Sequence, residues 1–367
     1  MGQRFATGPR RLTAQLVEDD VQGQVLVKDS HEAGAARNDE HAAAADRSDR
    51  RHATQSFLSK YVLIGVWVVV IIGFGLLEPK SFLTLDNFQV MFSSQAPLIL
   101  LALALVPTLI AGELDLSIAG SMTLGATITG QLNGVMGVPT APSLILGMVS
   151  GALVGAINAF LTIKLGVESI IVTLGMGTLL VGVSLAISNS LSISGVDRSV
   201  SDFLLNRSAG MSISFYLAII VAIIMWYVYR HAVTGRHLIY IGENVVAARL
   251  AGIQVGRLKT VSFLAGGLLA SSAGVMLIGA AGGVDPNSLQ PLLLGAFAGV
   301  FLGTATIEPG RPNVTGTVVA ILFLITGITG LQLIGISSWV SNVFYGGALV
   351  IAVTLARVVG VSLRAPR

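Results

Sequence analysis

Long apolar runs separated by short polar segments make up most of the chain after residue 60. Most of these runs approach the ~20 residues that an α-helix needs to cross ~30 Å of hydrocarbon. There are ten of them, at 61–77, 96–111, 117–136, 142–163, 169–190, 212–229, 260–281, 291–306, 314–335 and 339–356. The pattern predicts an all-α polytopic membrane protein with about ten transmembrane helices, two of them short.

The basic residues between the runs are predicted to lie mostly on one side of the membrane. If the N-terminus is cytoplasmic, three of them, Lys80, Arg198 and Arg207, fall outside and eleven fall inside. The inside set is Lys60, Lys164, Arg230, Arg236, Arg249, Arg257, Lys259, Arg311, Arg357, Arg364 and Arg367. Because cytoplasmic loops carry the excess of Lys and Arg, both termini are predicted to be cytoplasmic. A nine-span arrangement would place the basic 230–259 loop outside and is disfavoured.

The N-terminal part differs in composition from the rest of the chain. Nine of the 22 Lys and Arg residues and nine of the 19 Asp and Glu residues lie within residues 1–60. Such a polar segment buries too little apolar surface to offset the entropy of ordering. We therefore expect a disordered cytoplasmic tail at 1–56 and a transmembrane domain at 57–367. The 61–77 run ends in Glu-Pro-Lys with no small-residue cleavage site, so it is expected to remain as the first span.

Composition excludes several kinds of function. The chain has no cysteine and a formal net charge of +3, which gives no basis for a thiolate metal site, a cysteine nucleophile or nucleic-acid binding. No Gly-Lys pair occurs, so the usual phosphate loop of ATP-hydrolysing proteins is absent. All five histidines (His31, His41, His52, His231 and His237) lie outside the apolar runs. The sequence thus predicts neither an enzyme nor a protein with its own cofactor or metal.

Glycines recur at a spacing of four in two of the apolar runs. Gly147, Gly151 and Gly155 form one set, and Gly295, Gly299 and Gly303 form the other. This spacing puts small residues on one helix face and allows close packing of helices. Since both sets lie on helices predicted to run from outside to inside, they also hint at two related halves, as in many transporters.

A charged segment, YIGENVVAARLAGIQVGRLK at 240–259, joins the sixth run to the seventh on the predicted inside. Its centre contains helix-forming residues that end at Gly252, which favours a short amphipathic helix. Two interpretations follow. The segment is either an ordinary basic loop that fixes topology or a helix that docks on a cytoplasmic partner.

Polar residues in and between the runs are candidates for a solute pathway. Asp115 and Ser117 lie in AGELDLSIAGS between two short runs, and ionisable groups at membrane depth tend to mark a pathway. Asn158, Thr173, Gln332 and Asn342 are uncharged hydrogen-bonding groups suited to a polyhydroxylated neutral solute, although such groups also hold helices together. The lack of carboxylates at mid-membrane argues against coupling to protons or sodium.

Four motifs resemble a known family, the permease subunits of ribose, xylose, galactose and autoinducer-2 type bacterial ABC importers. They are GENVVAARLAGIQVGRLKTVSFLAGGLLASSAGVM (242–276), GELDLSIAGSM (112–122), NAFLTIKLGVESIIVTLGM (158–176) and GLQLIGISSW (330–339). The resemblance implies that 240–259 contacts the ATP-binding subunit and transmits its closure to the membrane helices. The residues that match the family's coupling loop are Gly242, Glu243, Asn244, Ala247, Ala248, Arg249, Leu250, Gly252 and Ile253.

Two segments depart from the family pattern. Asp115 and Ser117 match it, but the family usually has a second glycine and an apolar residue before this aspartate, so Glu113 departs from the pattern. The loop TIEPGRPNVTGT (306–317) stands where the family has a glycine-rich segment. Within this loop Glu308 and Arg311 are near enough in sequence to form an ion pair, and its proline and glycine residues enforce a bend. Because of these departures, the sequence does not decide whether the solute is a pentose or a related monosaccharide or polyol.

The resemblance implies a permease subunit of an ATP-driven sugar importer in the bacterial plasma (inner) membrane. Its expected partners are a separate ABC ATP-binding subunit, a periplasmic or lipid-anchored solute-binding protein, a second permease chain, identical or related, and membrane lipid. ATP would be bound by the partner, with no cofactor in this chain. The alternative is an ATP-independent secondary transporter or facilitator for a small polar solute.

Overall fold

The structure is a computed structural model that describes residues 61–363, with side chains described up to Thr354. The predicted tail at 1–56, the first residues of the predicted 57–367 domain and the two arginines after residue 363 lie outside the described residues. A helix covers Tyr61–Leu77. The further helices are α2 (Leu85–Ser93), α3 (Ala96–Ile110), α4 (Ile118–Gly130), α5 (Thr140–Ala159), α6 (Ser169–Ile187), α7 (Arg198–Leu205), α8 (Ile213–His231), α9 (Val233–Glu243), α10 (Val245–Leu250), α11 (Val255–Ala281), α12 (Pro291–Gly303), α13 (Val314–Leu333) and α14 (Val340–Leu363).

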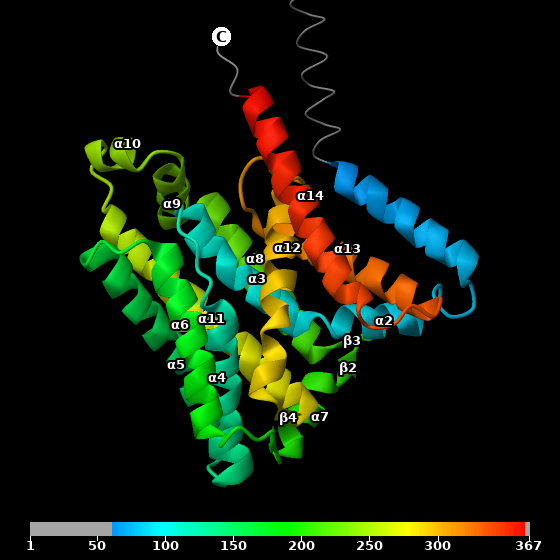
Figure 1. Ribbon diagram of the computed structural model, residues 1–367. Coiled ribbons are helices and arrows are strands. Elements are labelled where there is room, and N and C mark those ends of the chain that lie inside the picture. The colour runs from blue at the N-terminus through cyan, green and yellow to red at the C-terminus, as the bar shows by residue number, and fades with distance from the viewer. Residues whose placement is uncertain (1–60, 364–367) are drawn as a thin grey trace, which may run out of the picture. The chain divides into compact units, whose positions relative to one another are not determined.

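Short irregular elements extend or join these helices. Two π-helical turns, η1 (Gln131–Val135) and η2 (Phe160–Lys164), continue α4 and α5, and a 3-10 turn, η3 (Pro286–Leu289), precedes α12. Four two-residue strands form two antiparallel pairs, β1 (Ile193–Ser194) with β4 (Gly283–Val284) and β2 (Arg207–Ser208) with β3 (Met211–Ser212). The described part of the chain is therefore mostly helical (Figure 1).

All ten predicted apolar runs lie on helices. Among the described residues, five helices are by themselves long and apolar enough to cross a membrane, namely α5 with η2, α6, α8, α11 and α13. Helices α2 and α3 make a sixth span if this pair, bent by 46°, is one span. These findings confirm an all-α polytopic membrane protein. The helix at 61–77 and the apolar part of α14 are shorter, and α3, α4 and α12 have 15, 13 and 13 residues.

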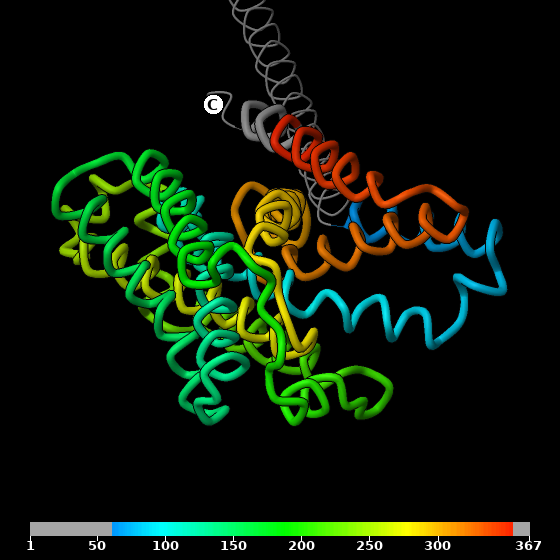
Figure 2. The backbone as a smooth tube through the Cα atoms, turned by 60° about the horizontal axis from the view of Figure 1, so that its bottom comes forward, coloured from blue at the N-terminus to red at the C-terminus, as the bar shows by residue number. Residues whose placement is uncertain are grey.

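The buried centre of the fold is formed by α3 and α11. Nearly every residue of α3 is buried, and α11, the 27-residue helix, packs against α3, α4 and α5 (Figures 1 and 2). Close packing of α5 on α11 depends on the first glycine set. A Cβ at Gly151 would lie 2.0 Å from the carbonyl oxygen of Gly267. The second set packs α12 against α13 and α14, so both sets serve helix packing.

Helix ends are fixed by ordinary capping. The Thr84 and Ser212 hydroxyls accept from backbone N–H groups in the first turns of α2 and α8, and Gly282, with φ +72°, ends α11. Asp197 caps α7 by accepting from the Ser199 N–H at 2.9 Å. This bond, with further hydrogen bonds from the Ser199 and Thr140 hydroxyls, lowers the pKa of the exposed Asp197 carboxyl.

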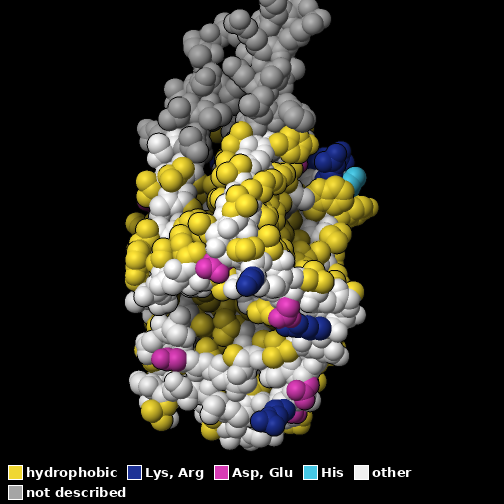
Figure 3. Space-filling view, turned by 90° about the vertical axis from the view of Figure 1, so that its right-hand side faces the viewer, with side chains coloured by type: hydrophobic (Ala, Val, Ile, Leu, Met, Phe, Trp, Pro, Cys, Tyr) yellow, Lys and Arg dark blue, Asp and Glu magenta, His cyan; other side chains and the backbone are white. Residues whose placement is uncertain are grey.

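Charged side chains and exposed apolar side chains lie on different parts of the surface. On the face drawn in Figure 3, charged side chains gather in the lower half and at one upper edge, and the surface between them is mainly hydrophobic. Many large apolar side chains of the helix at 61–77, α5, α6 and α8 are exposed. A membrane-embedded chain needs this arrangement because lipid, not water, covers those side chains.

Candidate functional site

The 240–259 segment contains a short helix where the sequence predicted one. Asn244 begins α10 by accepting a hydrogen bond from the backbone N–H of Ala247 at 3.0 Å. The helix ends after Leu250, and Gly252 follows with φ +79°, the left-handed conformation that glycine adopts without strain. The sequence did not predict α9, which precedes α10 and places Gly242 and Glu243 at its own C-terminus.

The two faces of α10 have different surroundings. Ala248 is buried and packs with Ile241 and Val255 of the same chain. On the other side, Val246 is 66% exposed and Leu250 86% exposed. The buried alanine fixes α10 to the chain, and the exposed apolar pair has no cover within the described residues.

The residues matched to the coupling loop divide between these faces. Ala248 is buried and Ile253 is half-buried; the others, Gly242, Glu243, Asn244, Ala247, Arg249, Leu250 and Gly252, are exposed. Sequence comparison missed Val246, although its spacing of four from Leu250 places the two side chains on one helix face. That spacing was the signal that could have identified it.

The end of α9 lies directly against the end of α3. A Cβ added at Gly242 would lie 2.0 Å from the carbonyl oxygen of Ile110. No side chain fits there, so the backbones of α9 and α3 touch. Movement of α9 toward the bundle would therefore press directly on the C-terminus of α3.

An ion pair gives the segment a second contact with the same region. Glu113, in the loop of residues 111–117 between α3 and α4, pairs with Lys259 near the start of α11. Each side chain is only 15% exposed, so water screens the pair less than it would at the surface. Glu113, the departure from the family pattern, is thus bonded to the 240–259 segment.

Asp115 lies deeper in the 111–117 loop. Its side chain is 1% exposed, and its Oδ1 accepts from the Ser117 backbone N–H at 2.9 Å and from the Ser117 hydroxyl at 2.6 Å. The carboxylate therefore lies beside the N-terminus of α4, where the helix dipole favours negative charge. Asn158 of α5 donates through Nδ2 to the same hydroxyl at 2.8 Å. Its Oδ1 is buried and accepts no hydrogen bond from the described residues.

Thr173 connects the same loop to α6. Its hydroxyl oxygen accepts from the Leu116 backbone N–H at 3.0 Å and lies 3.2 Å from the Leu114 carbonyl oxygen and 2.8 Å from that of Ser169. The loop is therefore bonded to α5 through Asn158, to α6 through Thr173 and to α11 through Lys259, and α9 touches α3 just before it. We call residues 111–117 with these contacts the hub loop.

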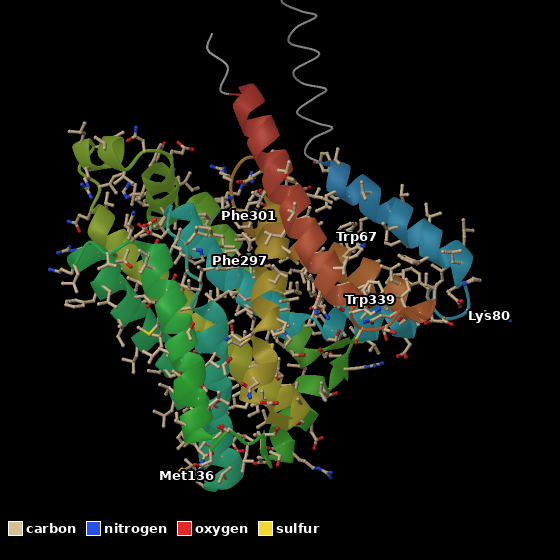
Figure 4. The ribbon with its side chains drawn as sticks, in the orientation of Figure 1. Trp67, Lys80, Met136, Phe297, Phe301 and Trp339 are labelled. Atoms are coloured by element: carbon tan, nitrogen blue, oxygen red, sulfur yellow. The ribbon has the colours of Figure 1, made fainter. Side chains whose placement is uncertain are left out.

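Four of the six predicted pathway residues thus meet at the hub loop. Asp115, Ser117, Asn158 and Thr173 bond to one another or to its backbone, beside the 240–259 segment. Gln332 and Asn342 are exposed and lie near the α13–α14 turn. Figure 4 shows Trp339, which stands between them in sequence, on the far side from α9 and α10. The first four make hydrogen bonds that attach helices to the loop, and a role of any of the six in the solute pathway stays a prediction.

The loop at 306–317, which departs from the family pattern, contains the ion pair that the sequence predicted. Glu308 and Arg311 form an ion pair at 2.7 Å. Asn313 begins α13 by accepting from the Gly316 N–H at 2.7 Å, and its Nδ2 lies 3.1 to 3.4 Å from four backbone carbonyl oxygens of residues 303–311. Within residues 61–363, no group of three or more metal-binding side chains is close enough to hold an ion.

Comparison with known proteins identifies the class. Residues 88–353 match the family model described as branched-chain amino acid transport system / permease component. The chain is 27% identical over 304 residues to the D-allose transport system permease protein AlsC of Escherichia coli, covering 83% of this chain and 93% of that one. It is 26% identical to the ribose import permease protein RbsC of the same organism, with 83% and 95% covered.

A third relative is an autoinducer-2 import permease, one of the kinds of permease that the sequence motifs resemble. The autoinducer 2 import system permease protein LsrD of Photorhabdus laumondii is 28% identical over 308 residues, with 82% of this chain and 91% of that one covered. No solved structure matches the chain significantly.

The chain belongs to this permease family. It is a multi-pass membrane component of an ABC import system, and not itself an enzyme, as the sequence predicted. Permeases of this kind work with ATP-hydrolysing and substrate-binding partners.

Proposed function

We propose that the chain forms the translocation pathway of an ATP-driven importer for a monosaccharide or related polyol in the bacterial inner membrane. In this proposal all ten helical runs cross or enter the membrane and both termini are cytoplasmic. A second permease chain, identical or related, completes the pathway. ATP-binding subunits dock at α10, and a solute-binding protein delivers the sugar at the other side.

Support for a sugar comes from the relatives. Those named above import or transport allose, ribose and autoinducer 2, and a further one is the fructose import permease protein FrcC of Rhizobium meliloti, 27% identical over 313 residues. The family description names branched-chain amino acids, so the test has to include both classes of solute.

The observation that carries the proposal is the position of α10. Its exposed apolar pair, Val246 and Leu250, faces away from the chain, and Arg249 is exposed beside it. An uncovered apolar pair next to a cation fits a groove with acidic rims on a partner protein. The helices on either side of α10 contact the membrane bundle, α9 through Gly242 and α11 through Lys259.

These contacts define a transmission route. Closure of the ATP-binding subunits would move α10, and α9 would then press on the end of α3 at Ile110. The Lys259–Glu113 pair would move the hub loop with α11, and Asn158 and Thr173 would carry that movement to α5 and α6. This route changes access to the pathway without any covalent chemistry in the chain.

The test is purification of the tagged chain from its native membranes in mild detergent, followed by mass spectrometry. We expect an ATP-binding subunit in about equal amount. Arg249→Glu combined with Leu250→Ser should lose that subunit, because the docking face is then anionic and polar. Arg257→Gln, a change at another exposed arginine outside α10, should retain it. Equal recovery from both variants would contradict docking at α10.

Reconstitution then separates the importer from the alternative carrier. Proteoliposomes containing the chain with its subunits are tested with D-allose, ribose, fructose and leucine. ATP-dependent sugar uptake is the expected result. Uptake of any of these solutes by the chain alone, without ATP, would overturn the importer proposal in favour of a facilitator.

A further inference from the structure

A cavity of about 530 Å³ lies next to α9, outside the hub loop. Its walls come from the end of α8, from α9 and from the loop of residues 304–313 between α12 and α13. The lining residues used below are Trp226, Arg230, Arg236, Tyr240, Glu243 and Arg311. We call this space the arginine cavity. The cavity shares α9 and Ile110 with the coupling route described above, but the arginine side chains that line it have no part in that route.

Positive charge in the arginine cavity is only partly neutralised. Its charged lining consists of three arginines and two glutamates, Glu243 and Glu308. Glu308 pairs with Arg311 at 2.7 Å. Arg230 and Arg236 have no carboxylate within ion-pair distance among the described side chains. The guanidinium groups of Arg230 and Arg236 therefore line the cavity without an ion-pair partner. Glu243 is the one carboxylate of the lining that is not already paired among the described side chains.

The 304–313 loop gives the cavity a fixed wall. The side-chain amide of Asn313 lies within hydrogen-bonding distance of four backbone carbonyl oxygens of residues 303–311. Ile307 has φ +61°, a strained backbone conformation for a β-branched residue. A strained turn persists only where its surroundings hold it, so Arg311 is presented from a rigid support.

The adjoining surface of α8 favours a lipid over a soluble anion as the occupant. Ile220, Ile223 and Tyr227 are exposed large apolar residues, and Arg230 follows one turn later on the same side of the helix. The Arg230 guanidinium lies 5.7 Å from the centre of the Trp226 ring. Exposed aliphatic residues, then aromatic rings, then arginines follow the order of acyl chain, interface and headgroup in a bilayer.

We propose that the arginine cavity binds the phosphate of an anionic phospholipid. Arg230 and Arg236 donate to the phosphate oxygens, because a guanidinium fork matches that group. The acyl chains lie along the exposed side of α8. The lipid would brace α8 against α9, so the composition of the membrane would affect the helix that leads into α10.

The test uses Trp226 as a reporter in the full chain. The sequence has three tryptophans, so Trp67→Phe with Trp339→Phe leaves Trp226 alone. This variant is placed in nanodiscs with dibrominated phosphatidylglycerol or dibrominated phosphatidylcholine at the same mole fraction, and quenching of its fluorescence gives the relative affinity. We expect a preference of about 25-fold for phosphatidylglycerol, because each of the two arginines contributes about fivefold and each change of one arginine to glutamine should remove that factor.

The matched control is Arg198→Gln, which removes an exposed arginine at the start of α7, and it should leave the preference unchanged. Thermal unfolding and gel filtration check that Arg230→Gln and Arg236→Gln fold. Equal quenching by both lipids, or a preference that survives the double Arg230→Gln, Arg236→Gln change, would overturn the proposal. A change of Trp226 fluorescence on adding millimolar inorganic phosphate in phosphatidylcholine nanodiscs, together with equal quenching by the two lipids, would identify a soluble-anion site and contradict the lipid site.

Discussion

Two loops interrupt the bundle at the end that carries α9 and α10, and they are held in opposite ways. Each follows a short buried helix, α3 or α12, and each contains one glutamate in an ion pair. Glu113 of the hub loop pairs with Lys259, 146 residues away on another helix. Glu308 pairs with Arg311, three residues away, and Asn313 closes the 304–313 loop on itself.

This difference separates a connecting loop from a supporting one. Atoms of the hub loop bond to α5, α6 and α11, so displacement of any of these helices changes the forces on the loop. The Glu308–Arg311 pair and the Asn313 hydrogen bonds hold the 304–313 loop to itself, to the end of α12 at Gly303 and to the first turn of α13, so these contacts keep its form when more distant helices move. We therefore expect changes in the hub loop to affect transport and changes in the 304–313 loop to be mostly local.

The largest effect is expected from Lys259→Glu. The substitution places two carboxylates together in a site that is mostly closed to water, which costs about 3 kcal/mol or more. ATP-driven uptake into proteoliposomes should fall by at least about tenfold, which corresponds to 1.4 kcal/mol of coupling energy. Adding Glu113→Lys restores an ion pair of reversed direction and should recover most of the uptake.

Arg257→Glu is the control for this charge reversal. Arg257 lies two residues earlier, is exposed and bonds only to Gln254 in the described chain, so its reversal should leave most of the uptake intact. If Lys259→Glu transports normally, or if the double reversal gives no recovery, the ion pair has no part in coupling.

A smaller but clear effect is expected from Gly242→Ala. The added methyl carbon would lie 2.0 Å from the Ile110 carbonyl oxygen, so α9 has to move away from α3. Such overpacking costs about 1–3 kcal/mol. Thermal unfolding in detergent and the ATP hydrolysis of the assembled transporter should both report the displacement.

Gly256→Ala provides the comparison on α11. Its added carbon would lie at an ordinary 3.5 Å from Ile163, and alanine favours a helix by about 1 kcal/mol over glycine. That variant should be as stable as the parent or more so. Equal behaviour of the two glycine variants would show that α9 does not press on α3.

The sequence predicted the architecture well because apolar length is a local property. Every apolar run lies on a helix, and the Glu308–Arg311 pair was predicted because its partners are three residues apart. The 111–117 contacts could not be found in this way. Glu113 was noticed only as a departure from the family, since nothing local connects it with Lys259.

Helix α9 and the break before α3 were missed for a similar physical reason. α9 consists of mixed polar and apolar residues, and neither a long apolar run nor a strong cap marks its start at Val233. The break between α2 and α3 follows from Pro97 at the start of α3, where the proline lacks an N–H to donate. Asn158 and Thr173 were recognised as polar residues inside helices, but only the fold shows that they bond to one loop.

The attachment of the hub loop to α6 is tested by Thr173→Val. The substitution keeps the shape of the side chain but removes the oxygen that accepts from the Leu116 N–H, leaving a buried donor unpaired at about 1–3 kcal/mol. Thr173→Ser should preserve both stability and uptake. Thr178→Val, on the exposed side of the same helix, loses only a hydroxyl that bonds to its own helix at Leu174 and should be neutral.

The smallest effect is expected from Glu308→Gln. This substitution in the 304–313 loop tests whether that loop matters less for transport than the hub loop does. The Arg311 and Glu308 side chains are 45% and 35% exposed, and an exposed pair contributes about 0.2–1 kcal/mol. Since Asn313 still holds the loop backbone, both the unfolding midpoint and uptake should remain near those of the parent. Glu113→Gln, the same chemical change at the hub loop, should lower both, because Lys259 is left without its partner in a mostly buried site. If the two glutamine variants instead lose equal activity, the second loop also transmits motion, and sequence separation of the ion-pair partners does not decide which loop couples.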